Sequence, residues 1–153
     1  MNKFEEAEEI GRQLFVKRFK NNYKWIAFFE DYTTIDGFFE LSGDTNEKYI
    51  MEIKNRSSHS LNSYPTWVLE DNKATSLFNA YKDFVKLNKN LKGALYVVIL
   101  KDCMLIWDIT KTDIGPIDTS KKMPKHTMSQ QKEYKNKENH YLKPDDAKWK
   151  IDI

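Results

Sequence analysis

The stretch that most restricts the fold is the nearly unbroken apolar run at 93–109, GALYVVILKDCMLIWDI. Lys101, Asp102 and Asp108 interrupt it, so it falls short of the roughly 20 apolar residues that a membrane helix needs. It predicts two strands joined by a tight turn, and the first of them is apolar on both faces. A strand of this kind lies inside a sheet that is covered on both sides.

Two segments carry the spacing of helices. Residues 3–20 contain strong helix formers, with acidic residues in the first turns and basic residues in the last, which suits the helix dipole. The apolar residues of this segment form one stripe, and Glu8 falls inside that stripe. A second helix is predicted from about Lys73 to Leu87, where apolar residues recur at helical intervals.

Three short strands are predicted between the two helices, at 25–30, 35–41 and 48–56. Short polar connections join them, so consecutive strands pair antiparallel. A strand reached through a helix usually lies parallel to the strand before it, and the sheet should therefore be mixed. The predicted fold class is α/β (α+β), with a central mixed sheet flanked by helices.

One domain is expected from the length of 153 residues, with a core at about 4–109 and a basic extension at about 114–153. In this extension, 127–134 and 139–143 are weak strand candidates. A hydrophobic fraction of 40% and a charged fraction of 31% indicate a soluble globular protein. The single Cys103 and the lack of a signal-like N-terminus favour an intracellular, cytoplasmic location, with no membrane partner.

The segment YIMEIKNR holds the residues that most need a chemical explanation. In a strand, Glu52 and Lys54 share one face and lie roughly 6.6 Å apart. Ionised groups in a central strand are costly unless they are paired or bound to metal. A Glu–Lys pair at a solvated sheet edge would also explain them. Antiparallel pairing, however, would bring Asp36 opposite the end of the same strand.

Asp36, Glu52 and Lys54, in an α-β-β-β-α-β order over about residues 4–109, resemble the PD-(D/E)XK nuclease superfamily. The resemblance implies a restriction endonuclease-like core in which Asp36 and Glu52 hold a divalent metal and Lys54 assists the attacking water. The expected ion is Mg²⁺, with Mn²⁺ as a substitute, and the backbone carbonyl of Ile53 is expected to complete the ligands. Ile35 stands where the name-giving motif has Pro, a departure that many members share.

Two further catalytic residues are suggested by the same resemblance. Many members carry an acid on the first helix, and Glu8 fits best, with Glu5 and Glu9 as alternatives; a solvated acidic face explains these residues equally well. Some members place Gln or Lys on the helix after the Glu-x-Lys strand, and Lys73 fits there, together with Glu70. An ordinary Glu–Lys pair on that helix remains the alternative.

Nucleic-acid binding is suggested by the distribution of charge rather than by the formal net charge of +2, which is too small to indicate it. Residues 120–153 carry 9 basic and 5 acidic side chains, and aromatic rings among them could stack on unpaired bases. A solvated chain end explains the same composition. The candidate DNA-binding residues are Arg56, Lys121, Lys122, Lys125, Lys135 and Lys137.

The sequence therefore predicts a Mg²⁺-dependent nuclease acting on DNA, of the kind found in phage or mobile-element recombination, repair or restriction. A catalytically inactive nucleic-acid-binding or structural protein with the same fold is the alternative. For resolvase-like members a homodimer is expected. A zinc site is not favoured, because His59, His126 and His140 lie far apart in the sequence and are expected at the surface.

Overall fold

The computed structural model describes residues 2–19, 23–30, 35–42, 47–88, 90–118, 122–124, 134–136 and 138–152. For Trp25, 122–124 and 134–136 it describes the backbone alone. The helices are α1 (Lys3–Arg18) and α2 (Asp71–Val85), with two short 3₁₀ turns at Leu61–Ser63 and Pro144–Asp146. The strands are β1 (Tyr23–Phe28), β2 (Gly37–Leu41), β3 (Lys48–Asn55), β4 (Trp67–Glu70), β5 (Leu91–Ile99), β6 (Cys103–Asp108), β7 (Lys122–Pro124), β8 (Tyr134–Asn136), β9 (Asn139–Leu142) and β10 (Trp149–Asp152).

A six-stranded sheet in the order β1-β2-β3-β5-β6-β10 forms the centre of the molecule. The first three strands pair antiparallel, whereas β3 and β5 pair parallel through the α2 crossover. This confirms the mixed sheet that the sequence predicts. It also places β3, which carries Glu52 and Lys54, in the interior of the sheet.

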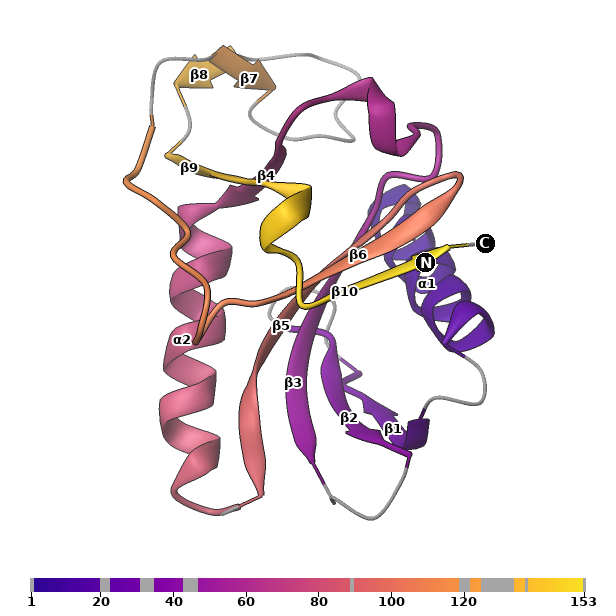
Figure 1. Ribbon diagram of the computed structural model, residues 1–153, viewed down its shortest axis with the longest axis vertical. Helices are drawn as coiled ribbons and strands as arrows, with labels where there is room; N and C mark the ends of the chain where they lie inside the picture. Colours follow the sequence, from indigo (N-terminus) through magenta and orange to yellow (C-terminus); the bar gives the residue numbers. More distant parts are fainter. Residues whose placement is uncertain are drawn as a thin grey trace.

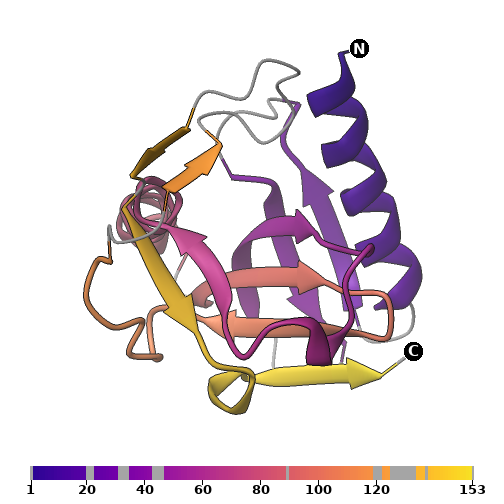
Figure 2. The ribbon, with the colours of Figure 1, turned by 90° about the horizontal axis from the view of Figure 1, so that it is seen from above.

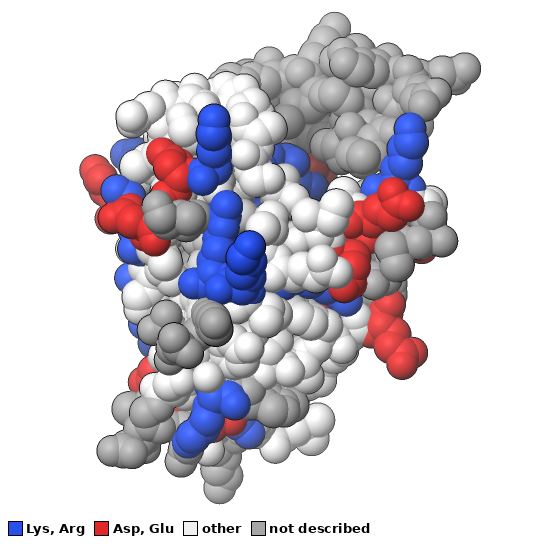
Figure 3. All heavy atoms as spheres, turned by 90° about the vertical axis from the view of Figure 1, so that its right-hand side faces the viewer, with Lys and Arg blue, Asp and Glu red and all other residues white. Residues whose placement is uncertain are grey.

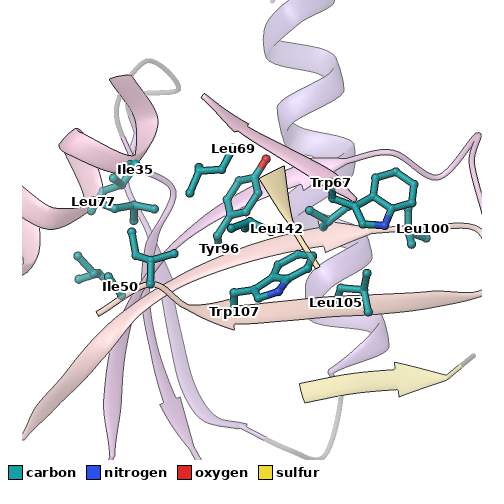
Figure 4. Close-up of a cluster of buried hydrophobic side chains, with 14 of the residues drawn as sticks. Ile35, Ile50, Trp67, Leu69, Leu77, Tyr96, Leu100, Leu105, Trp107 and Leu142 are labelled. Atoms are coloured by element: carbon teal, nitrogen blue, oxygen red, sulfur yellow. The ribbon is translucent and has the colours of Figure 1, made fainter. Parts of the chain in front are cut away.

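The two helices cover opposite faces of this sheet, as the two ribbon views show (Figures 1 and 2). Phe15 and Phe19 of the α1 region pack on the face that includes Tyr49, Met51 and Ile53. On the other face, α2 closes a second core around Ile50, Tyr96 and Trp107 (Figure 4). β5 contributes to both cores and is buried except at Lys92, which confirms that the apolar run is a strand covered on two sides.

The helix predicted from about Lys73 to Leu87 is α2, which runs from Asp71 to Val85, and the residues directly before it form the strand β4. β4 pairs antiparallel with β9, so the sequence candidate at 139–143 is a strand. The candidate at 127–134 lies outside the described residues except for Tyr134, which begins β8. β4 was not predicted as a strand, since its four residues are too short to show a period of two.

The C-terminal part of the chain contributes directly to the main sheet. β10 pairs antiparallel with β6 as the edge strand, and Leu142 of β9 is buried in the core on the α2 side. The ring of Trp149 contacts Tyr49 edge to face at 5.8 Å between centroids. Leu142 and the strand β10 are therefore packed against the strands that position the candidate site. Neither helix of the described chain is long and apolar enough to cross a membrane.

Candidate functional site

Asp36 directly precedes β2. Beyond Met51, the strand β3 has no partner residue in β2. Gly37 pairs with Met51, and the amide of Asp36 donates to the carbonyl of Met51 at 3.0 Å. Beyond this pair, the amide of Ile53 donates to Asp36 Oδ2 at 2.6 Å. The side chain of Asp36 thus takes the next place in the hydrogen-bond ladder, beside the end of β3 as the antiparallel register predicts.

Arg12 of α1 holds the other oxygen of Asp36. Its Nε lies 2.7 Å from Asp36 Oδ1, and its Nη1 donates to the carbonyl of Phe29 at 2.6 Å. Arg12 is 4% exposed, so both charges of this pair are withdrawn from water. Arg12 was not among the residues predicted from the sequence. The feature that could have identified it is its position one helical turn after Glu8, next to the buried Gly11.

Glu8 projects from α1 toward the same place. Carboxylate oxygens of Glu8, Asp36 and Glu52 all lie within 4.8 Å of one another. The alternatives are engaged elsewhere: Glu5 accepts from the amide of Asn2 in the helix cap, and Glu9 accepts from Gln13 Nε2 at 3.2 Å. Among the acids that the sequence left open on the first helix, Glu8 is the one that joins this carboxylate cluster.

Glu52 of β3 is the most deeply buried of the glutamates in the cluster, with 4% exposure. Its Oε1 lies 3.4 Å from Lys73 Nζ on α2, so the predicted lysine does reach the cluster. Its Oε2 is buried and has no hydrogen-bond partner among the described residues. A buried carboxylate oxygen of this kind is costly unless a proton or a cation neutralises it.

The electrostatics of the cluster reflect burial and mutual repulsion. Burial, followed by the charge of Asp36, raises the pKa of Glu52 to about 8. Burial also raises the pKa of Glu8, and the nearby charge of Asp36 raises it further. For Asp36, burial raises the pKa although the hydrogen bond from Arg12 opposes the rise. Three carboxyl groups in one desolvated place favour the uptake of positive charge.

Lys54 follows Glu52 on the same face of β3 and is partly buried. Burial lowers the pKa of its ammonium group, and the neighbouring charge of Arg56 lowers it further. Its charge in turn opposes the rise in the pKa of Glu8, which places Lys54 in the electrostatic field of the cluster. A lysine with a lowered pKa is a better proton acceptor than a solvated one.

The donor set suits a hard divalent cation. Mg²⁺ prefers carboxylate and carbonyl oxygens and keeps several of its waters. The unpartnered Glu52 Oε2 and the neighbouring carboxylates supply such oxygens. In a strand the N–H and C=O of one residue point to the same side, so the carbonyl of Ile53 points toward the side of β3 where Asp36 lies. The residues present therefore fit the predicted metal, although their roles stay predictions.

Of the candidate DNA-binding residues, Arg56 lines a pocket that Lys54 also lines. Lys122 and Lys135 lie in β7 and β8, of which the backbone alone is described, and Lys121, Lys125 and Lys137 lie outside the described residues. Figure 3 shows the face of the molecule on the right-hand side of Figure 1, with Lys and Arg at its centre and Asp and Glu on both sides. The described part of that face carries charges of both signs and is not uniformly basic.

His140 corrects the expectation that the histidines lie at the surface. It is 5% exposed, and its Nε2 lies 2.7 Å from Asp71 Oδ1 while its Nδ1 lies 3.0 Å from the carbonyl of Gly115. It therefore ties β9 to the first turn of α2. His59 is partly buried in the pocket beside Lys54, and His126 lies outside the described residues.

No protein-family model and no curated protein matches this chain. Among solved structures, a Holliday junction resolvase, Hjc, from the archaeal hyperthermophile Archaeoglobus fulgidus matches it with a TM-score of 0.54 over 97% of this chain and 92% of the other. The two sequences are 11% identical, so the likeness concerns the fold. The protein has an α+β, restriction endonuclease-like fold with a curled mixed central sheet and two helices.

Proposed function

We propose that this protein is a divalent-cation-dependent nuclease that hydrolyses DNA phosphodiester bonds. The observation that carries the proposal is the convergence of Glu8, Asp36 and Glu52 beside two lysines. A protein without catalysis gains little from burying these charges together, because each one is costly to desolvate. The fold shared with a Holliday junction resolvase supports the same reaction class.

In this proposal Asp36, Glu52 and the carbonyl of Ile53 hold Mg²⁺ or Mn²⁺, and Glu8 adds negative charge beside them. A bound cation would lower the pKa of an attacking water and stabilise the charge that develops on the phosphate. Arg12 fixes the orientation of the Asp36 carboxylate through its 2.7 Å contact. Lys73 does the same for Glu52 Oε1. Lys54 orients the water and takes part in its deprotonation.

The proposed substrate is DNA of the branched kind that recombination or repair produces, in a phage, mobile-element or restriction context. The name of the structural neighbour supports a junction, and a resolvase-like reaction on two strands would require a homodimer. Light scattering on the purified protein tests the dimer. A panel of single-stranded, duplex, bulged and four-way DNA tests the form of the substrate.

Cleavage of that panel with 5′-labelled strands, in buffer containing either Mg²⁺ or EDTA, tests the function itself. We expect cleavage in Mg²⁺ and none in EDTA. Lys54→Met should slow cleavage by about 10²- to 10⁴-fold, the usual contribution of a group that moves a proton. Asp36→Asn and Glu52→Gln should abolish the metal-dependent rate. Glu40→Gln, which lies in β2 away from the carboxylate cluster, is the matched control and should cleave normally.

A non-catalytic DNA-binding protein is the second candidate, and one observation favours it. Both oxygens of Asp36 already accept hydrogen bonds, from Arg12 and from the amide of Ile53. An aspartate satisfied in this way can be structural. No cleavage of any DNA form with Mg²⁺ or Mn²⁺ would favour this alternative, whereas unchanged cleavage in Asp36→Asn and Glu52→Gln would mean that the nuclease site lies elsewhere.

A further inference from the structure

A pocket of about 350 Å³ lies beside the candidate site and shares Lys54 with it. The pocket is formed where β3 and β5 of the main sheet meet the β4–β9 pair. The residues that line it include Lys54, Arg56, His59, Tyr64, Trp67 and Tyr96. Its composition is aromatic and basic, and none of the described residues that line it is acidic.

The aromatic wall of the pocket is built from rings that brace one another. His59 meets Tyr64 at 5.2 Å between centroids, and Tyr64 meets Trp67 at 5.5 Å, both edge to face. The hydroxyl of Tyr96 donates to the carbonyl of Val68 at 2.9 Å, which fixes that ring against β4. Figure 4 shows Trp67 and Tyr96 within the core cluster from which this wall extends. Tyr64 is itself 50% exposed, so part of its side chain remains accessible to a ligand.

A residue that lines the pocket also carries an unsatisfied hydrogen-bond donor. Trp67 is 4% exposed, and its Nε1 is buried with no partner among the described residues. Buried indole N–H groups usually have a hydrogen-bond partner, because a buried N–H without a hydrogen bond costs free energy. An acceptor on a ligand that reached this donor would relieve that cost.

We propose that this pocket binds one unpaired nucleobase of the DNA substrate. A nucleobase combines a flat ring, which stacks on aromatic side chains, with ring and carbonyl acceptors that can take the Trp67 N–H. Lys54 and Arg56, which line the same pocket, supply positive charge for the phosphates of that nucleotide. The inference rests on the proposed nuclease function and defines its substrate class as DNA with an unpaired nucleotide beside the scissile phosphate.

The size of the pocket suits one nucleotide. Its volume is at the lower end of the range of about 300–1,000 Å³ for small-molecule sites. A base must leave the duplex to reach a pocket of this kind, and the free energy for unpairing is smallest where the base is already unpaired. Branch points, bulges and single-stranded ends offer such bases, whereas a continuous duplex does not.

Fluorescence anisotropy in EDTA, where no cleavage occurs, tests the inference with two bulged duplexes that differ by one base. One carries a bulged adenine and the other an abasic residue at the same position, so their phosphates are the same. We expect the wild-type protein to bind the bulged adenine about tenfold more tightly, the size of a single base–aromatic stack. Tyr64→Ala should remove most of this preference, and Trp67→Phe should reduce it by removing the N–H donor.

Two control variants keep the test specific. Leu87→Ala truncates an exposed apolar side chain elsewhere, and Trp149→Phe removes an indole on the opposite face of the sheet; both should keep the preference. Equal binding of the two bulges by the wild-type protein, or an undiminished preference in Tyr64→Ala, would overturn the inference. Because Tyr64 is half exposed, that variant should fold even if Trp67→Phe does not.

The two proposals fail separately. A preference for the bulged adenine without cleavage of any DNA would support the nucleobase pocket and contradict the nuclease function. Cleavage with Mg²⁺, combined with equal binding of the adenine and abasic bulges, would support the nuclease function and contradict the nucleobase pocket.

Discussion

Single residues decide how three carboxyl groups can be buried together in this protein. Asp36 is neutralised by Arg12 and is also hydrogen-bonded to the amide of Ile53. Glu52 has Lys73 on one oxygen, while its other oxygen lacks a partner among the described residues. The cluster is therefore only partly neutralised by the chain, and Glu52 is the residue whose protonation should respond most to pH or to a cation.

Arg12 should be essential for stability because it is the buried counter-charge of Asp36. In Arg12→Met the carboxylate stays buried without its ion-pair partner, and losing one partner of a buried pair typically costs about 3–5 kcal/mol. We expect a loss of that size in the free energy of unfolding, measured by urea denaturation at pH 7. Lys17→Met on the exposed side of α1 should change it by less than about 0.5 kcal/mol. A loss below 1 kcal/mol in Arg12→Met would contradict the assigned role.

The raised pKa of Glu52 predicts a pH dependence of stability in the absence of divalent cations. The native state keeps a proton on Glu52 up to a pKa of about 8, against an ordinary value of 4.5 in the unfolded chain. Between these values the native state binds more protons, so its stability falls as the pH rises. We expect the free energy of unfolding in EDTA to decrease from pH 5 to pH 9 in the wild-type protein.

Glu52→Gln should show a smaller decrease over the same range, because glutamine has no proton to lose. The free energy of unfolding of Glu40→Gln should decrease with pH as that of the wild-type protein does. Parallel pH profiles for the wild-type protein and Glu52→Gln would show that Glu52 is not the group responsible.

At the scale of elements, the site depends on how closely β1 and β2 approach. A Cβ atom on Gly37 would lie 2.1 Å from the carbonyl oxygen of Ala27 in β1, a contact that requires one backbone to move. Gly37 directly follows Asp36, so the close approach of the two strands and the position of the carboxylate are set together. A Cβ atom on Gly11, in α1, would instead make only an ordinary van der Waals contact, with Asn55 Cβ as its nearest atom at 3.5 Å.

Substitution by alanine should therefore change the free energy of unfolding in opposite directions at the two glycines. Gly37→Ala should lower the free energy of unfolding by about 1–3 kcal/mol, as overpacking does. Gly11→Ala should raise it by up to about 1 kcal/mol, because glycine inside a helix is unfavourable relative to alanine. Thermal unfolding followed by circular dichroism measures both. An unchanged Tm for Gly37→Ala would mean that the strands separate without cost.

At the scale of the whole molecule, the carboxylate cluster joins α1, β3 and the residue directly before β2, and Lys73 adds α2. A cation that binds only the folded protein stabilises it by about 2.7 kcal/mol at a concentration 100-fold above its Kd. For a chain of this size, that corresponds to a rise in Tm of about 5–10 °C. We expect this rise with saturating Mg²⁺ or Mn²⁺, and a larger rise at pH 8 than at pH 6, because the ion must displace the Glu52 proton.

Asp36→Asn and Glu52→Gln should lose the cation-dependent rise in Tm, whereas Glu40→Gln should keep it. This readout does not depend on DNA or on cleavage. An equal rise in all three variants would place the cation elsewhere on the protein.

The sequence by itself determined the parts of this protein that depend on short-range patterns. Period-two alternation puts Glu52 and Lys54 on one face of a strand, and a short connection between β2 and β3 restricts their register enough to bring Asp36 beside Ile53. Helical spacing predicted both helices, and the position of Glu8 in the apolar stripe of α1 indicated that it faces the sheet.

Only the tertiary structure decided the features that depend on contacts between distant segments. Arg12 is buried in a pair with Asp36, which lies 24 residues further along the chain, a pairing that no local pattern of α1 contains. β4 and β9 are strands because they pair with each other, and β10 because it pairs with β6. The pocket that we propose for a nucleobase forms only where β4 and β9 meet β3 and β5. Periodicity records which face of a segment is apolar, but the partner that covers that face is decided by the packing of the whole chain.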